Sequence, residues 1–111
     1  MSTKKKRKNR SGDVDATAFL KKLTGGPLTL GEALLAIRRC EERSQASFAT
    51  LLRISRQHLC DLEKGRRLLS PGRAAKFAKI LGYSESQFVR LALQDQLAVA
   101  DLDYRVELNA A

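Results

Sequence analysis

A pair of short helix signals, separated by a tight break, constrains this chain more than any other feature of its sequence. Ser44 can cap a helix over residues 45–52, and Ser55 can cap a second helix over residues 56–64. Gly65 suits the left-handed backbone position that follows the second helix. The sequence therefore predicts two helices joined by a tight turn, and the residue types around that turn decide what the pair can be.

The order of residue types around the turn narrows the range of folds to which this helix pair can belong. Gln45 opens the first helix, Ala49 lies where the two helices must approach closely, and Glu63 lies at the close of the second helix. The apolar positions are Phe48, Leu52, Ile54, Leu59 and Leu62. This pattern resembles the lambda-repressor-like, XRE-type helix-turn-helix family, which includes the lambda repressor and Cro. The resemblance covers residues 30–82.

Capping and stop signals place the other helices. A capping-box pattern begins at Thr29, Ser70 and Pro71 form an N-cap and first-turn pair, and Ser84 opens the last helix. These signals predict helices at about 14–23, 30–42, 71–81 and 84–99. With the resemblance, we expect an all-α, lambda-repressor-like five-helix bundle that contains the helix-turn-helix.

The ends differ from the middle in composition. We expect a basic disordered arm at 1–12, a short helix and linker at 13–26, a helix-turn-helix DNA-binding domain at 27–99, and a C-terminal tail at 100–111 that serves dimerisation or partner binding. In the tail, Tyr104, Val106 and Leu108 alternate with charged residues, which is typical of a β-strand. A lone strand is not stable, so it would pair with a dimer mate, pair with another chain, or stay frayed.

The charge of the chain favours an acidic partner. The formal net charge is +9, but residues 1–10 hold six basic residues and no acid, so the rest carries only +3. Nucleic acid is the first candidate partner and an anionic membrane surface the second. The arm has three interpretations that the sequence leaves open, namely contact with DNA in the minor groove or along phosphates, contact with a partner protein, or a solvated tail.

Catalytic and metal-binding signals are missing from the sequence. Cys40 and Cys60 form no CxxC motif, His58 is the only histidine, and no nucleophile–base pair or phosphate-binding glycine loop is present. We therefore expect no enzyme activity, no metal and no cofactor. No apolar run approaches the roughly 20 residues that span a bilayer, so we expect no membrane partner and a cytoplasmic protein that joins the nucleoid when it is bound to DNA.

The resemblance implies roles for individual residues. The helix at 56–64 would enter the major groove of double-stranded DNA by its N-terminal end. The base-contacting residues would be Arg56, Gln57 and Asp61. Arginine pairs with guanine, glutamine with adenine, and a carboxylate can accept from cytosine. The phosphate-contacting residues would be Gln45, Ser55, Lys64, Arg66 and Arg67.

The resemblance also implies two structural features. Arg38 on the preceding helix would form a partly buried ion pair with Glu63, which would hold the second helix to the bundle. The family usually has glycine at the turn, where this chain has Arg53. A positive φ there would cost a residue with a Cβ on the order of 1 kcal/mol.

Three functions fit these expectations. The first is a repressor that binds a palindromic operator as a homodimer, with half-sites roughly 34 Å apart. The second is an antitoxin of the HigA type that represses its own promoter and neutralises a toxin protein through its appendages. The third is a protein–protein adaptor that has lost DNA binding, against which Gln45, Arg56, Gln57 and Lys64 argue.

Overall fold

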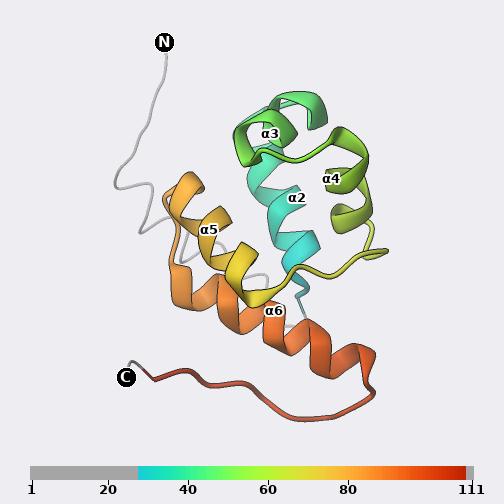
Figure 1. Cartoon of the computed structure of the whole chain (residues 1–111), viewed down its shortest axis with the longest axis vertical. Helices are drawn as coiled ribbons and strands as arrows, with labels where there is room; N and C mark the ends of the chain where they lie inside the picture. The colour runs from blue at the N-terminus through green and yellow to red at the C-terminus, as the bar shows by residue number, and fades with distance from the viewer. Residues whose placement is uncertain (1–27, 110–111) are drawn as a thin grey trace.

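Five helices make up the part of the chain that this computed structural model describes, residues 28–109 (Figure 1). They are α2 (Leu30–Cys40), α3 (Gln45–Leu52), α4 (Arg56–Glu63), α5 (Pro71–Leu81) and α6 (Glu85–Val99). The predicted all-α class is confirmed, and the observed bounds differ from the predicted ones by no more than two residues. The expected helix at 14–23 and the basic arm at 1–12 lie outside the described residues.

A side-chain cap begins each of these five helices. In every case the hydroxyl oxygen accepts a hydrogen bond from the backbone N–H three residues later. The first N–H groups of a helix have no partner within the helix, so such a cap contributes about 1 kcal/mol. This local signal explains why the sequence predicts the helix starts well. The capping residues are Thr29, Ser44, Ser55, Ser70 and Ser84.

The core lies where these helices meet. α3 and α4 pack on each other and α4 packs on α2, while α5 packs along α6, which also contacts α2. In Figure 1, α6 crosses below the other helices. Phe48 and Phe88 are the two largest fully buried side chains. The helix-turn-helix is therefore fixed by contacts with α2 on one side and α5 on the other. The other buried apolar residues are Leu30, Ala33, Leu34, Ile37, Ala49, Leu52, Leu59, Leu62, Leu69, Ala74, Phe77, Ala78, Leu91 and Ala92.

Gly31 permits a close contact between α2 and α4. A Cβ built at Gly31 in the first turn of α2 would overlap the carbonyl oxygen of Leu62 near the end of α4. Because the obstacle is backbone, no side-chain rotation can relieve the overlap. The absence of a side chain at Gly31 therefore sets how near α4 lies to α2.

An ion pair holds the end of α4 to α2. Arg38 Nε lies 2.7 Å from Glu63 Oε2, and Arg38 Nη2 donates to Glu63 Oε1 at 3.1 Å. The Glu63 side chain is only 4% exposed and that of Arg38 15%. The pair that the resemblance implies is thus present as a two-bond contact that is largely removed from water. A third nitrogen, Arg38 Nη1, donates to the carbonyl of Arg43 beyond the end of α2.

A buried carboxylate on α6 holds the other end of α2. Asp95 Oδ2 accepts a hydrogen bond from the backbone N–H of Leu30 at 3.0 Å. Burial raises the pKa of Asp95 to about 6, with a smaller upward contribution from the charge of Glu32, while the Leu30 hydrogen bond acts in the opposite direction. Asp95 therefore joins α6 to the start of α2 at the expense of a partly desolvated charge at neutral pH.

The tail differs from the expectation. The segment from Tyr104 to Leu108 forms no strand in the described part of the chain, and it runs back along α6 (Figure 1). Gln94 on α6 donates its amide N–H to the carbonyl of Tyr104 and accepts from the backbone N–H of Val106 at 2.9 Å. The expected strand is absent because no second strand lies beside it, and Gln94 satisfies two backbone groups in its place.

Replacing Gly31 by alanine should destabilise the fold. Alanine favours a helix by about 1 kcal/mol over glycine, but the overlap with the Leu62 carbonyl should outweigh that gain. We expect a net loss of about 1–3 kcal/mol in the free energy of unfolding, measured by urea denaturation. Gly72→Ala on α5 is the matched control, because nothing lies within 4 Å of a Cβ built there. Equal stability of the two variants would contradict the close-contact account.

Removing the Glu63 carboxylate should cost far more than removing an exposed one. Glu63→Ala leaves the Arg38 guanidinium partly buried and without its partner, so we expect a loss of about 3–5 kcal/mol. Glu41→Ala breaks the exposed pair with Arg43 and should cost less than about 1 kcal/mol. Thermal unfolding followed by circular dichroism measures both, and an unchanged melting temperature for Glu63→Ala would refute a stabilising role for the pair.

The raised pKa of Asp95 predicts a specific pH dependence of stability. The folded pKa of about 6 exceeds the usual value of 3.8, so folding favours the protonated form. This contribution is full below about pH 4 and is lost as pH rises through 6. The melting temperature of the wild type, relative to Asp95→Asn, should therefore fall between pH 4 and pH 7. His58 titrates in both proteins and cancels in the difference, and a flat difference would show that Asp95 is not desolvated.

Candidate nucleic-acid interface

The first turn of α4 projects polar side chains away from the bundle. Leu59 and Leu62 bury the inner face of α4 in the core, whereas Arg56 and Gln57 are exposed. Ser55 Oγ caps the helix by accepting from the backbone N–H of His58 at 2.9 Å. Its hydroxyl hydrogen can still donate to an anion, and the start of a helix favours negative charge. Two of the three predicted base-contacting residues, Arg56 and Gln57, therefore stand at an accessible, electropositive helix end.

The turn before α4 has the backbone geometry that the resemblance implies. Arg53 adopts φ 63° and ψ 39°, which is the left-handed region. The backbone N–H of Ile54 donates to the carbonyl of Ala49 at 3.0 Å and closes the turn. Ala49 is 2% exposed, because α3 and α4 meet there. A small side chain at Ala49 and a positive φ at Arg53 together fix how α4 leaves α3.

A hydrogen-bonded chain joins the start of α3 to both ends of α4. Gln45 Nε2 donates to Glu63 Oε1 at 2.9 Å, and Gln45 Oε1 lies 3.5 Å from Arg56 Nη1. Gln45 is a predicted phosphate contact, and one of its two amide hydrogens is engaged within the protein. The other remains for an outside acceptor. Gln45 thus positions Arg56 as well as presenting its own amide at the start of α3.

Asp61 is engaged inside the protein. Asp61 Oδ1 accepts from Gln57 Nε2 at 3.0 Å and from Arg66 Nη1 at 3.2 Å. The Asp61 side chain is only 20% exposed. The structure therefore brings Gln57, Asp61 and Arg66 together, and places Asp61 as an acceptor for its neighbours. A base contact by Asp61 would require one of these two bonds to be exchanged.

Basic side chains follow α4 closely. Lys64, Arg66 and Arg67 are all exposed, and the chain bends at Gly65 with φ 77°. The effect of nearby cations is visible at His58 on α4. Its pKa is lowered by burial first, and then by the positive charges of Arg67 and Arg73. Arg73 at the start of α5 therefore adds to this group of cations.

Metal-ligating clusters and membrane-spanning helices are absent from residues 28–109. These residues contain no cluster of three or more metal-ligating side chains. Cys40 is exposed, Cys60 is half-buried, and both are free thiols. Among the same residues, no helix combines the length and the apolar character that crossing a bilayer requires.

The family comparison agrees with the geometry of this surface. Residues 35–88 match the family described as Helix-turn-helix, an interval that includes α3, the turn, α4 and α5. No curated protein and no solved structure matches the chain significantly. The family's domain is a DNA-binding regulatory unit and not a catalytic one. Residues 35–88 therefore match the XRE, lambda-repressor-like helix-turn-helix family, whose domain is that of DNA-binding regulators.

Proposed function

We propose that this protein is a sequence-specific transcriptional repressor that inserts the first turn of α4 into the major groove of double-stranded DNA. The observation that carries the proposal is the exposure of Arg56 and Gln57 at the start of a helix whose opposite face is buried. A major groove admits an α-helix, and the paired donors of arginine and the amide of glutamine match guanine and adenine edges.

The surrounding cations fit the phosphate backbone on either side of that groove. Lys64, Arg66 and Arg67 follow α4, while Gln45 and Ser55 begin α3 and α4. Contacts of this kind supply affinity and register but carry no sequence information. In the proposed complex, discrimination between sequences comes from Arg56 and Gln57. Asp61 acts there mainly by orienting Gln57, to which it is already bonded.

The proposal includes a homodimer on a two-fold operator. Proteins that bind DNA through a single short recognition helix gain specificity by binding two half-sites roughly 34 Å apart. The exposed apolar side chains beyond the middle of α6 support a second copy as the partner of this region. Val99 is 72% exposed and Tyr104 67%, and Leu102 lies between them.

An antitoxin is the second candidate, and the tail favours it over the adaptor. The backbone of residues 103–109 pairs with no strand in the described structure, and Tyr104 and Leu108 are exposed. A tail of this kind can add to the edge of a sheet in a partner such as a toxin. The exposure of Arg56 and Gln57 argues against an adaptor, because DNA binding is the role that the proposal gives these two side chains. Copurification of a toxin encoded by a neighbouring gene would distinguish the antitoxin from a simple repressor.

Double replacement of Arg56 and Gln57 by alanine should abolish sequence preference. Duplexes enriched from randomised DNA by the wild type serve as the specific probe, and a scrambled duplex as the non-specific one. Each lost bidentate contact is worth about 1–3 kcal/mol, so the ratio of the two affinities should fall by roughly 100-fold. Failure of the wild type to enrich any sequence, or an unchanged ratio in the double variant, would refute the proposal.

Lys64→Gln is the matched control for that experiment. It should weaken binding to both duplexes alike and reduce the slope of log affinity against log salt by about 1, because it removes one phosphate contact. Thermal unfolding confirms that each variant is folded.

A further inference from the structure

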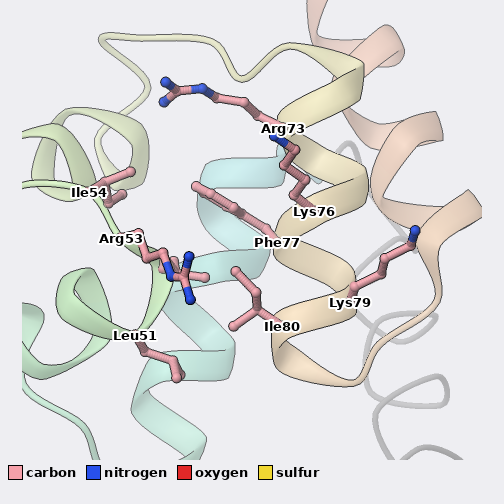
Figure 2. A pocket seen from close by; sticks show the side chains of 9 residues that line it. Leu51, Arg53, Ile54, Arg73, Lys76, Phe77, Lys79 and Ile80 are labelled. Carbon is pink, nitrogen blue, oxygen red and sulfur yellow. The ribbon is translucent and has the colours of Figure 1, made fainter.

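A groove lies between the helix-turn-helix and α5, and of its lining residues only Arg73 also belongs to the group of cations near α4. This α3–α5 groove runs between residues 51–54 and residues 73–80 and encloses about 690 Å³ (Figure 2). Its lining consists of five apolar and four basic residues, with no acidic one. Volumes of about 300–1,000 Å³ are typical of small-molecule sites.

The floor of the groove is apolar. Phe77 and Ile80 extend from α5 toward the turn, where Leu51 and Ile54 face them (Figure 2). Ile80 is 42% exposed and Leu51 and Ile54 are half-buried, whereas Phe77 is only 4% exposed, so the part of the floor open to water is made by Ile80, Leu51 and Ile54. An occupant with an apolar body would remove this surface from water, which is favourable by about 25 cal/mol for each Å² covered.

Three cations border the floor without an acidic partner. The side chains of Arg53, Arg73 and Lys76 form no hydrogen bond or ion pair with any other residue of the described 28–109 segment. The fourth basic residue, Lys79, lies 3.7 Å from the carboxylate of Glu85. Arg73 and Lys76 are three residues apart on α5, so they share a face of the helix. The border is therefore suited to a negative charge that the described residues do not supply.

Arg53 occupies its position at a conformational cost. Its left-handed backbone would suit glycine, which adopts a positive φ without strain. The guanidinium of Arg53 extends over the groove beside Ile80 (Figure 2). Such a conformation persists where the surrounding structure fixes it, as the close approach of α3 and α4 does here. The result is a positive charge placed over an apolar floor.

We propose that the α3–α5 groove binds a small organic acid with an apolar body. The apolar part covers Ile80, Leu51 and Ile54, and the carboxylate lies at the basic border beside Arg53. A DNA phosphate matches only the charged border and leaves the apolar floor unused. The occupant would contact the turn that leads directly into α4, and its binding is measured on the protein without DNA.

Titration of the full chain with three probes, followed by NMR chemical shifts, tests the proposal. Octanoate carries both the charge and the apolar body, acetate carries the charge alone, and octyltrimethylammonium carries a similar body with the opposite charge. We expect octanoate to shift signals from residues 51–54 and 73–80, and to bind at least roughly tenfold more tightly than either control. Equal binding of octanoate and either control, or shifts outside the groove, would overturn the proposal. Tighter binding by an acidic amphipathic peptide would replace the small acid with a protein partner and would also overturn it.

Arg53→Gly separates binding from folding. Glycine relieves the positive φ, so the melting temperature should rise, while the affinity for octanoate should fall roughly tenfold with the loss of one charged contact. Arg39→Gln on the exposed end of α2 lies outside the groove and is the charge-matched control, which should leave octanoate affinity unchanged. Unchanged octanoate affinity in Arg53→Gly would refute the assignment of this residue, and a stable variant ensures that the result does not reflect unfolding.

Discussion

The position of α4 depends on one buried carboxylate. Glu63, at the last residue of α4, accepts two hydrogen bonds from Arg38 on α2 and one from Gln45 on α3. Three helices therefore meet at a single charged group that is almost out of reach of water. Such a group stabilises only while its partners stay in place, so it favours one arrangement of α2, α3 and α4 over alternatives. The absence of a side chain at Gly31 completes the arrangement by letting α4 lie close to α2.

Local chemistry explains why much of the fold could be predicted from sequence. The helix starts follow from hydroxyl caps such as Ser55, whose partner lies three residues away in the chain. The features that were missed are non-local. The closeness of Gly31 to Leu62 depends on how two helices meet, and glycine in a helix has no distinctive local signal for that. The burial of Asp95 could have been predicted from sequence, because Asp95 continues the helical spacing of the buried residues Phe88, Leu91 and Ala92 on α6. The tail lacks its strand because strand pairing needs a partner that no alternation of residues can specify.

The candidate interface was predicted in part. Exposure of Arg56 and Gln57 follows from the apolar spacing on the opposite side of α4, which the sequence shows. The Arg38–Glu63 pair came from the family resemblance, since its members are 25 residues apart. The engagement of Asp61 by Arg66 depends on how the chain bends after α4, and the α3–α5 groove depends on α5 lying beside the turn. The Asp61–Arg66 contact and the groove both form between separate segments of the chain, so the residue pattern of a single helix does not predict either of them.

The bond between Gln57 and Asp61 has a consequence for how such a protein would search a genome. A glutamine amide that meets a mismatched base usually leaves polar atoms unpaired, which penalises every incorrect site. Here the amide already has an acceptor of its own at 3.0 Å. In the proposed complex it would stay satisfied on the wrong sequence, so passage along unrelated DNA would meet little resistance at that position. In the proposed complex, the same internal partner would narrow the free-energy gap between correct and incorrect bases at Gln57.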